Sequence, residues 1–250
     1  MSCEIDFDHL PQTKSNAPNL IFIHGAGGDK TQWEKQRGFF QKYGWGVITL
    51  SLPSHGQSYH LKSVTLDNYV KTVYDFVIDR KIEDVSLVGH SMGGAIALEC
   101  VLQNPDLIVN KLILIGTGAK LKVNPVFFEA IETDFNQFLE LLGKVAFHRN
   151  TSFKIKNENE RILRGNGATI FYQDFKICNL FDTRSKLQNI TNQTLILVGQ
   201  DDQMTPVKYS TFLHENIKNS QLAVIPEAGH YVFEEKPLAV NKQIYKFISG

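Results

Sequence analysis

The sequence predicts an α/β protein with a mostly parallel central sheet flanked by helices, and two patterns support this prediction. Short apolar runs rich in Leu, Ile and Val alternate with longer segments in which apolar residues recur every three or four positions. The apolar runs lack strict alternation of polar and apolar residues, as is typical of strands covered on both faces of a parallel sheet. With 250 residues, the chain is long enough to bury a sizeable core of this kind.

Six buried strands are predicted from the apolar runs, at residues 19–24, 45–51, 85–89, 111–116, 194–199 and 221–225. Helices are predicted between and after them, at residues 66–77, 92–103 and 237–247. Thr65 is expected to cap the first of these helices, and Pro237 fits the first turn of the last. Within the last helix, Leu238, Ile244 and Phe247 are expected to face the core.

One long segment breaks this alternation. Between residues 118 and 192 no buried strand is apparent, and the pattern favours several helices joined by polar loops. Because such a segment is too long for a plain connection, we expect it to form an inserted helical cap, while residues 1–117 and 193–250 form the α/β core. The predicted cap holds nine of the 17 phenylalanines, whose rings either pack small helices together or line a pocket: Phe127, Phe128, Phe135, Phe138, Phe147, Phe153, Phe171, Phe175 and Phe181.

The strongest local motif is Gly-His-Ser-Met-Gly-Gly at residues 89–94, which lies between a predicted strand and a predicted helix. A serine at such a sharp turn has a strained backbone, and its neighbours two positions away must lack a Cβ atom, as Gly89 and Gly93 do. The turn exposes the Ser91 hydroxyl at the carboxyl edge of the sheet, where the helix N-terminus points toward it. The motif in this context predicts a nucleophilic serine. His90 is expected to pack or orient rather than to react.

A glycine-rich loop, His-Gly-Ala-Gly-Gly at residues 24–28, follows the first predicted strand. Such a loop, supported by Gly25, can approach the serine closely and offer a backbone N–H, which we expect to be that of Ala26. The N–H of Met92 supplies a second donor. The two donors together predict an oxyanion hole, and His24 is expected to hold the loop by hydrogen bonds.

A serine hydroxyl needs a base that takes its proton and an acid that orients the base. Asp201 and Asp202 follow the strand predicted at 194–199, and His230 follows the one at 221–225. Because the carboxyl ends of parallel strands meet at one edge of a sheet, these residues are expected near Ser91. The sequence thus provides a nucleophile, an acid and a base in that order along the chain.

Composition and spacing exclude several other classes of function. A phosphate loop is excluded because Asp29 stands where the Walker motif needs glycine, and Lys30 where the dinucleotide motif needs one. The 26 basic and 26 acidic residues cancel, which removes the usual basis for nucleic-acid binding. Residues 118–192 carry 11 basic and 8 acidic residues, an excess too small to predict an anionic substrate.

Composition and residue spacing also indicate where the protein is located and whether it needs a cofactor. No apolar stretch is long enough for a membrane span, and the acidic start does not resemble a secretory signal. Cys3, Cys100 and Cys178 are too far apart for a CxxC pair, which favours a reducing, cytoplasmic location. No histidine or cysteine spacing indicates a metal site, and no cofactor is expected.

Taken together, the motifs resemble those of the α/β-hydrolase fold family over nearly the whole chain apart from the cap. Five motifs occur in the family's order, at residues 24–28, 52–58, 89–94, 199–206 and 228–230. In this family the acid stands three residues after the glycine and four before the proline of the fourth motif, which selects Asp202 over Asp201. Asp201 would then cap the loop. The second motif departs from the common pattern, because Ser51 precedes it and Ser54 replaces a glycine.

The resemblance implies a serine hydrolase with the catalytic triad Ser91, Asp202 and His230, which cleaves carboxylic esters through an acyl-enzyme intermediate. The Phe-rich cap suggests apolar or aromatic small-molecule substrates. Alternatives on the same triad are a lactonase, a thioesterase, a C–C bond hydrolase and a cofactor-free haloperoxidase. A ligand receptor with minimal turnover is the alternative that is not an enzyme. The chain is expected to be a monomer or a homodimer.

Overall fold

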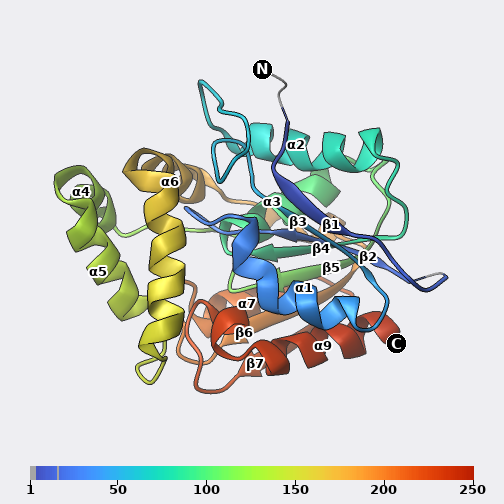
Figure 1. Ribbon diagram of the computed structural model, residues 1–250. Helices are drawn as coiled ribbons and strands as arrows, with labels where there is room; N and C mark the ends of the chain where they lie inside the picture. Colours follow the sequence, from blue (N-terminus) through green and yellow to red (C-terminus); the bar gives the residue numbers. More distant parts are fainter. Residues whose placement is uncertain (1–3, 16) are drawn as a thin grey trace.

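The computed structural model describes residues 4–15 and 17–250, so Cys3 lies outside the described part. Its sheet has seven strands in the order β1-β3-β2-β4-β5-β6-β7, and only β1 runs antiparallel to its neighbour. The α/β class with a mostly parallel sheet is therefore confirmed (Figure 1). The strands are β1 (Phe7–Leu10), β2 (Asn19–Ile23), β3 (Gly46–Leu50), β4 (Val85–His90), β5 (Val109–Ile115), β6 (Gln193–Gly199) and β7 (Ser220–Ile225).

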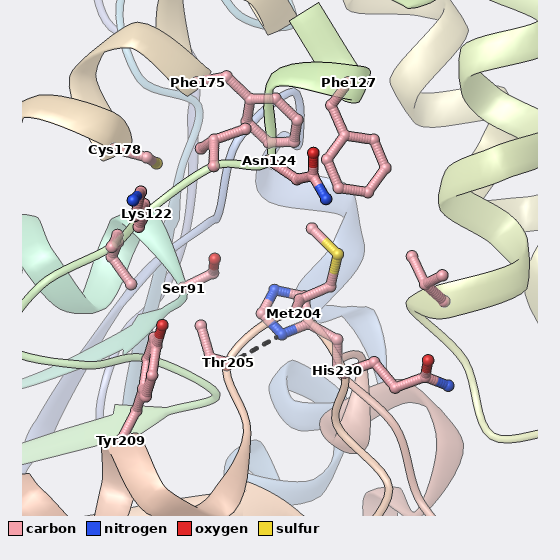
Figure 2. Close-up of a pocket in the computed structure, with 14 residues that line it drawn as sticks. Ser91, Lys122, Asn124, Phe127, Phe175, Cys178, Met204, Thr205, Tyr209 and His230 are labelled. Atoms are coloured by element: carbon pink, nitrogen blue, oxygen red, sulfur yellow. Dashed lines mark hydrogen bonds between the residues drawn. The ribbon is translucent and has the colours of Figure 1, made fainter.

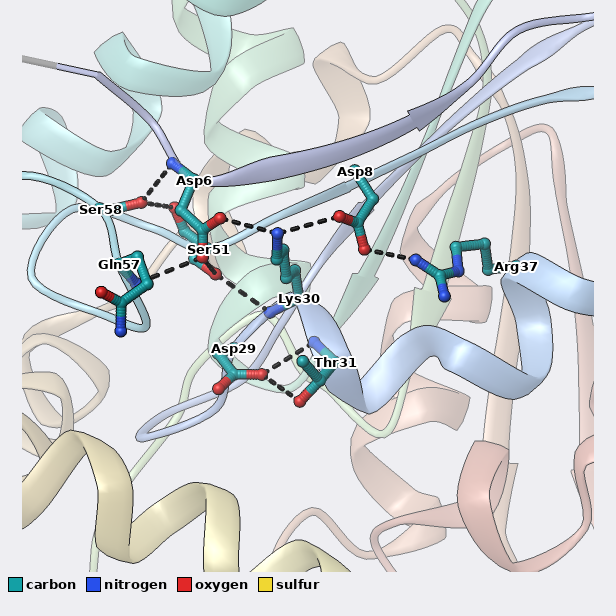
Figure 3. A network of polar contacts seen from close by, with 9 residues as sticks. All are labelled: Asp6, Asp8, Asp29, Lys30, Thr31, Arg37, Ser51, Gln57 and Ser58. Carbon is teal, nitrogen blue, oxygen red and sulfur yellow. Dashed lines mark hydrogen bonds and ion pairs between the residues drawn. The ribbon is translucent and has the colours of Figure 1, made fainter.

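The first strand was not predicted, and ion pairs attach it to the chain just after the glycine-rich loop. The Lys30 ammonium lies 2.7 Å from Asp6 Oδ1 and 2.9 Å from Asp8 Oδ1, and Arg37 pairs with the second carboxylate (Figure 3). Asp29 accepts a hydrogen bond from the N–H of Thr31 and so caps the short helix η1 (Lys30–Trp33). The lysine after the glycine-rich loop thus has a structural role.

The two faces of the sheet bury different residues, as the alternation of side chains along a strand requires. On β2, Ile21 and Ile23 join the core under α2 (Leu66–Asp79), α3 (Met92–Gln103) and α7 (Val207–Asn216). Leu20 and Phe22 join the core on the opposite face, which is covered by α1 (Glu34–Gln41), α8 (Val232–Glu235) and α9 (Pro237–Ser249) (Figure 1). Burial on both faces explains why the strands read as continuous apolar runs.

The three helices predicted in the core, α2, α3 and α9, agree with prediction at several positions and differ at one, whereas α1, α7 and α8 were not predicted. The Thr65 side chain accepts the N–H of Asn68 at the start of α2, and α3 has the bounds predicted from the sequence. The expectation that Leu238 faces the core is wrong, because its side chain is 64% exposed. In α9 the buried face is set by Val240 and Ile244, and a residue two positions before Val240 lies on the other side of the helix.

Between β5 and β6 the chain forms α4 (Pro125–Thr133), α5 (Phe135–Val145) and α6 (Phe153–Leu180), followed by η2 (Arg184–Asn189). Figure 1 shows these three α-helices together at one end of the sheet, within the segment predicted as a cap. Gly167, with φ +81°, interrupts α6. Most of the phenylalanine rings pack against one another around the fully buried Phe138, whereas Phe153 is 83% exposed.

The register of the strands places the predicted site at one edge of the sheet. Ile23 pairs with Gly89, and Gly199 pairs with Ile225, so the segments that follow the parallel strands β2, β4, β6 and β7 leave the sheet at the same edge. The glycine-rich loop, the serine turn, the aspartate loop and the histidine loop are these segments. The fold therefore collects all the predicted catalytic residues at the carboxyl edge.

Candidate active site

Ser91 forms a strained turn between β4 and α3. Its φ is +52° and its ψ is −114°, which is a rare conformation for a residue other than glycine. A Cβ atom on Gly89 would lie 2.2 Å from the carbonyl oxygen of Gly93, and one on Gly93 would lie 2.2 Å from that of Ile23. Glycine at both positions therefore allows α3 to start close against the sheet.

Neighbouring backbone and a threonine hold this turn in place. The Ser91 N–H donates to the carbonyl oxygen of Ile115 at 2.9 Å, and the Thr117 hydroxyl donates to the carbonyl oxygen of Ser91 at 2.8 Å. A Cβ atom on Gly94 would lie 2.6 Å from the Thr117 methyl carbon. The strained serine is thus fixed by the end of the next strand, β5.

His230 and Asp202 are in direct contact. The imidazole Nδ1 lies 2.9 Å from Asp202 Oδ2, and both side chains are buried. Asp202 Oδ1 also accepts the N–H groups of Met204 at 2.9 Å and Thr205 at 2.8 Å. The Thr205 hydroxyl donates to Asp202 Oδ2 at 2.8 Å and lies 3.2 Å from the imidazole Nδ1. Thr205 was not among the site residues predicted from the sequence.

Asp201 lies elsewhere. Its side chain is 48% exposed, and the carboxylate is 4.0 Å from His148 Nε2. Its own N–H donates to the carbonyl oxygen of Ala228 at 2.9 Å. The structure therefore brings Asp202, rather than Asp201, to His230.

Ser91 and His230 line the same cavity, which has a volume of about 220 Å³ (Figure 2). No hydrogen bond joins these two side chains in the part of the chain that is described, and Figure 2 shows the serine hydroxyl on the side of the imidazole that faces away from Thr205. Catalytic contacts of this kind often tighten only when substrate binds. Six of the fourteen lining residues are apolar: Leu121, Val123, Phe127, Val145, Phe175 and Met204. Cys178 also lines it, whereas Phe181 is buried in the core beneath α2 and α3.

Two buried histidines support the loops around the serine. His24 Nε2 accepts the N–H of Leu52 at 2.9 Å, and its Nδ1 bonds to the carbonyl oxygen of Gly25 at 2.8 Å. His90 Nε2 bonds to the carbonyl oxygen of His230 at 3.1 Å. Burial lowers the pKa of both His24 and His90 well below the usual histidine value, so both rings are neutral at pH 7. Their hydrogen bonds hold the glycine-rich loop next to Leu52 and the serine turn next to the His230 loop.

The glycine-rich loop is held from the other side by helix α6. The Gly27 N–H donates to Asp174 Oδ2 at 2.8 Å, and the Asn166 amide donates at 2.9 Å to the carbonyl oxygens of Gly27 and Gly28. Gly27 has φ +66°, and a Cβ atom there would lie 2.2 Å from the Phe171 ring. Neither the Ala26 nor the Met92 N–H donates to another group within residues 4–15 and 17–250. Both remain available for an oxyanion.

Asp174 is the centre of a buried network that the sequence did not reveal. It is fully buried and accepts hydrogen bonds from His55 Nε2 at 2.8 Å and from the Tyr69 hydroxyl at 2.9 Å, in addition to the Gly27 N–H. Burial disfavours the charged imidazole, but the adjacent Asp174 carboxylate raises the pKa of His55 above its usual value. His55 and Asp174 are 119 residues apart, so no local pattern signals the pair.

The loop that carries the histidine is attached to the same region. The His230 N–H donates to the carbonyl oxygen of Ala146 at 2.8 Å. Glu235 accepts the N–H of Gly229 at 2.8 Å through Oε1 and the N–H of His148 at 2.8 Å through Oε2. Residues between β5 and β6 therefore contact both the glycine-rich loop and the histidine loop.

The geometry can be compared with known proteins. A sequence profile described as the alpha/beta hydrolase family matches residues 20–243. The chain belongs to the α/β hydrolase family. It is 27% identical over 247 residues to the uncharacterized hydrolase YugF of Bacillus subtilis, which covers 92% of this chain and 89% of that protein. It is also 27% identical over 255 residues to a 2-hydroxy-6-oxo-6-phenylhexa-2,4-dienoate hydrolase of Burkholderia cepacia, with 92% and 87% coverage.

Solved structures give the same fold. An esterase from Exiguobacterium antarcticum superposes with a TM-score of 0.92 at 22% identity, covering 98% of this chain and 96% of the other. A thermophilic esterase, 29% identical, superposes with a TM-score of 0.84 and covers 98% of both chains. The relatives of this α/β hydrolase thus include esterases and related hydrolases.

The described residues were expected to contain neither a metal site nor a membrane span. Among them, no group of three or more His, Cys, Asp or Glu side chains is arranged to hold a metal ion. No helix formed by these residues is both long and apolar enough to cross a membrane.

Proposed function

We propose that this α/β hydrolase is a serine esterase that cleaves carboxylic esters of small molecules through an acyl-enzyme intermediate. One observation carries the proposal: Ser91 and His230 line one cavity, and Asp202 Oδ2 lies 2.9 Å from the imidazole Nδ1. This is the arrangement of a nucleophile, a base and an orienting acid. The 29% identical esterase that superposes over 98% of the chain supports an ester substrate.

Each residue has a defined role in the proposed reaction. His230 Nε2 takes the hydroxyl proton of Ser91 as the oxygen attacks the ester carbonyl. Asp202 holds Nδ1 and stabilises the imidazolium that forms. The imidazolium then gives its proton to the leaving alcohol, and a water activated by the same imidazole releases the acid.

The oxyanion of each tetrahedral intermediate would lie between the N–H groups of Ala26 and Met92. Met92 is the first residue of α3, so the helix dipole adds to the stabilisation. A single donor of this kind is typically worth about 10²–10³ in rate. The loop contacts of His24, Asp174 and Asn166 would keep the first donor in position.

The cavity limits the substrates that this site would accept. Its apolar wall favours an apolar acyl group, and its volume of about 220 Å³ favours a small one. Of the nine phenylalanines predicted to lie in the cap, Phe127 and Phe175 line the cavity. The part of the acyl group that lies inside this cavity is therefore proposed to be short and apolar.

Labelling with a fluorophosphonate tests the nucleophile. We expect the wild type to be labelled and the Ser91→Ala variant, folded to the same extent, to remain unlabelled. A panel of 4-nitrophenyl esters then tests turnover, with steady multiple turnover expected on short acyl chains and a loss of about 10⁴-fold or more in Ser91→Ala. A folded wild type that resists the label would contradict the assignment, and a single slow turnover would favour a ligand receptor.

A further inference from the structure

A second groove adjoins the catalytic cavity and shares two residues with it. The groove has a volume of about 350 Å³, and Lys122 and Tyr209 line both it and the cavity that contains Ser91. Figure 2 shows these two residues on the side of Ser91 that faces away from His230. A molecule held at Ser91 could therefore extend past Lys122 and Tyr209 into the groove.

The groove is strongly cationic. Its lining contains Lys120, Lys122, Arg184 and Lys208. Asp182 engages two of them, because its carboxylate lies 2.9 Å from the Lys120 ammonium and 2.7–2.8 Å from the Arg184 guanidinium.

Two ammonium groups remain without a counter-charge. Lys122 and Lys208 are both exposed, and neither forms an ion pair within the part of the chain that the structure describes. The chain as a whole has a formal charge of +0, so this excess is a local concentration beside the active site. Such a concentration attracts an anion and increases its rate of encounter with the site.

The groove also offers surface to an apolar chain. The Phe212 ring, 38% exposed, lies beside Tyr209 in the lining. The Tyr209 hydroxyl makes no hydrogen bond within residues 4–15 and 17–250, so it can bond to a ligand. The catalytic cavity alone, at about 220 Å³, is smaller than the roughly 300–1,000 Å³ of typical ligand pockets. A substrate of ordinary size would need the additional room.

We propose that this groove binds the anionic end of the substrate, so that the preferred esters carry a terminal carboxylate on the chain that leads away from the scissile bond. Lys122 and Lys208 would pair with the carboxylate, while Tyr209 and Phe212 would contact the methylene chain. The proposal rests on the esterase function proposed above and specifies its substrate class: half-esters of dicarboxylic acids rather than fully neutral esters.

Matched pairs of substrates test the groove. Each pair consists of the 4-nitrophenyl half-ester of a dicarboxylic acid, from glutarate to suberate, and the ester of equal length that ends in a neutral carboxamide. At low salt we expect kcat/KM to be about 5- to 10-fold higher for the carboxylate at the best chain length. The ratio should decline toward one in about 0.5 M NaCl, which screens exposed charges.

Two double variants locate the effect. In Lys122→Gln/Lys208→Gln we expect the carboxylate-to-carboxamide ratio to fall close to one. Lys154→Gln/Lys218→Gln removes the same charge from exposed positions outside both cavities, and there the wild-type ratio should persist.

The possible failures are distinguishable. Equal rates on both substrates at every length, or a ratio that survives in Lys122→Gln/Lys208→Gln, would overturn the groove while leaving the esterase proposal intact. Hydrolysis of neither substrate by the folded wild type would overturn the proposed function, and the substrate class would fail with it.

Discussion

Replacing Asp174 with alanine should slow catalysis although this residue lies outside the catalytic cavity. Its carboxylate accepts three hydrogen bonds, from the Gly27 N–H, His55 Nε2 and the Tyr69 hydroxyl, at 2.8–2.9 Å. A buried donor that loses its partner costs about 1–3 kcal/mol. The tyrosine hydroxyl can turn, and a water can enter the space, so we expect the free energy of unfolding to fall by about 2–4 kcal/mol.

The effect on the reaction should be separate from this loss of stability. Gly27 follows Ala26, the proposed oxyanion donor, and the Asp174 carboxylate is the acceptor that fixes the Gly27 N–H. Removing an oxyanion donor costs about 10²–10³ in rate, and a donor that is displaced rather than removed should cost less. We expect kcat on a short 4-nitrophenyl ester to fall by about 10-fold or more, with KM changed far less.

The assay requires a control that weakens the network without releasing the loop. Tyr69→Phe removes one donor to Asp174 and leaves its contacts with Gly27 and His55. That variant should lose about 1 kcal/mol of stability and keep kcat within about twofold. Urea unfolding gives the stabilities, and initial rates are measured well below the unfolding temperature. If Asp174→Ala were destabilised but retained the wild-type kcat, the idea that α6 positions the oxyanion loop would be wrong.

Three further predictions concern the acid and a separate buried carboxyl. Thr205→Val should lower kcat severalfold, because it removes the hydroxyl that donates to Asp202 Oδ2. Thr205→Ser keeps a hydroxyl and should retain most activity. Equal kcat values for the two variants would show that the hydroxyl is dispensable. Asp202→Asn should reduce kcat by about 10⁴-fold, while Asp201→Asn should keep kcat close to the wild-type value. A large loss in Asp201→Asn and none in Asp202→Asn would show that Asp201 is the acid that orients His230. Burial raises the pKa of Glu234 to about 8. The folded state therefore retains a proton that the unfolded state releases near its usual pKa, so stability should fall by about 2–4 kcal/mol as pH rises from 5 to 8.5. Glu234→Gln should abolish that dependence in thermal unfolding, and an unchanged slope would exclude this carboxyl as its source.

The sequence predicts best where a local pattern decides the structure. The strands buried on both faces are apparent as apolar runs, and the serine turn requires glycines at fixed offsets, so Gly89 and Gly93 could be recognised without coordinates. The edge strand β1 was missed because Phe7–Leu10 is short and only partly buried, and therefore lacks such a run. Helix α1 was missed for a related reason, since Gln36 and Phe40 are the only residues of its eight that are buried.

Partners that are distant along the chain could not be predicted. Thr205 is the contrasting case, because it lies close to Asp202 in sequence and a hydroxyl near the acid could have been recognised. Asp174, Asn166 and Glu235 carry no such signal, because they contact the glycine-rich and histidine loops through backbone N–H and carbonyl groups, which no sequence pattern marks. The positive charge of the groove could not be predicted from the composition either. Its cations come from three separate stretches of the chain. Residues 118–192 hold three of them but have only a small net excess of basic residues, and Lys208 lies outside that segment.

These distant contacts change the meaning of the predicted cap. A lid that opens freely would need few bonds to the catalytic loops, but here α6 binds the glycine-rich loop through Asp174 and Asn166, and the stretch after α5 binds the histidine loop through Ala146 and His148. Opening the segment as a rigid body would break these hydrogen bonds and displace the proposed oxyanion donor, Ala26, from the serine. The energy that holds the segment closed is therefore also the energy that arranges the catalytic loops. For this α/β hydrolase, a substrate that followed the proposed route past Lys122 and Tyr209 would not require such disruption, because these two residues line both the groove and the cavity.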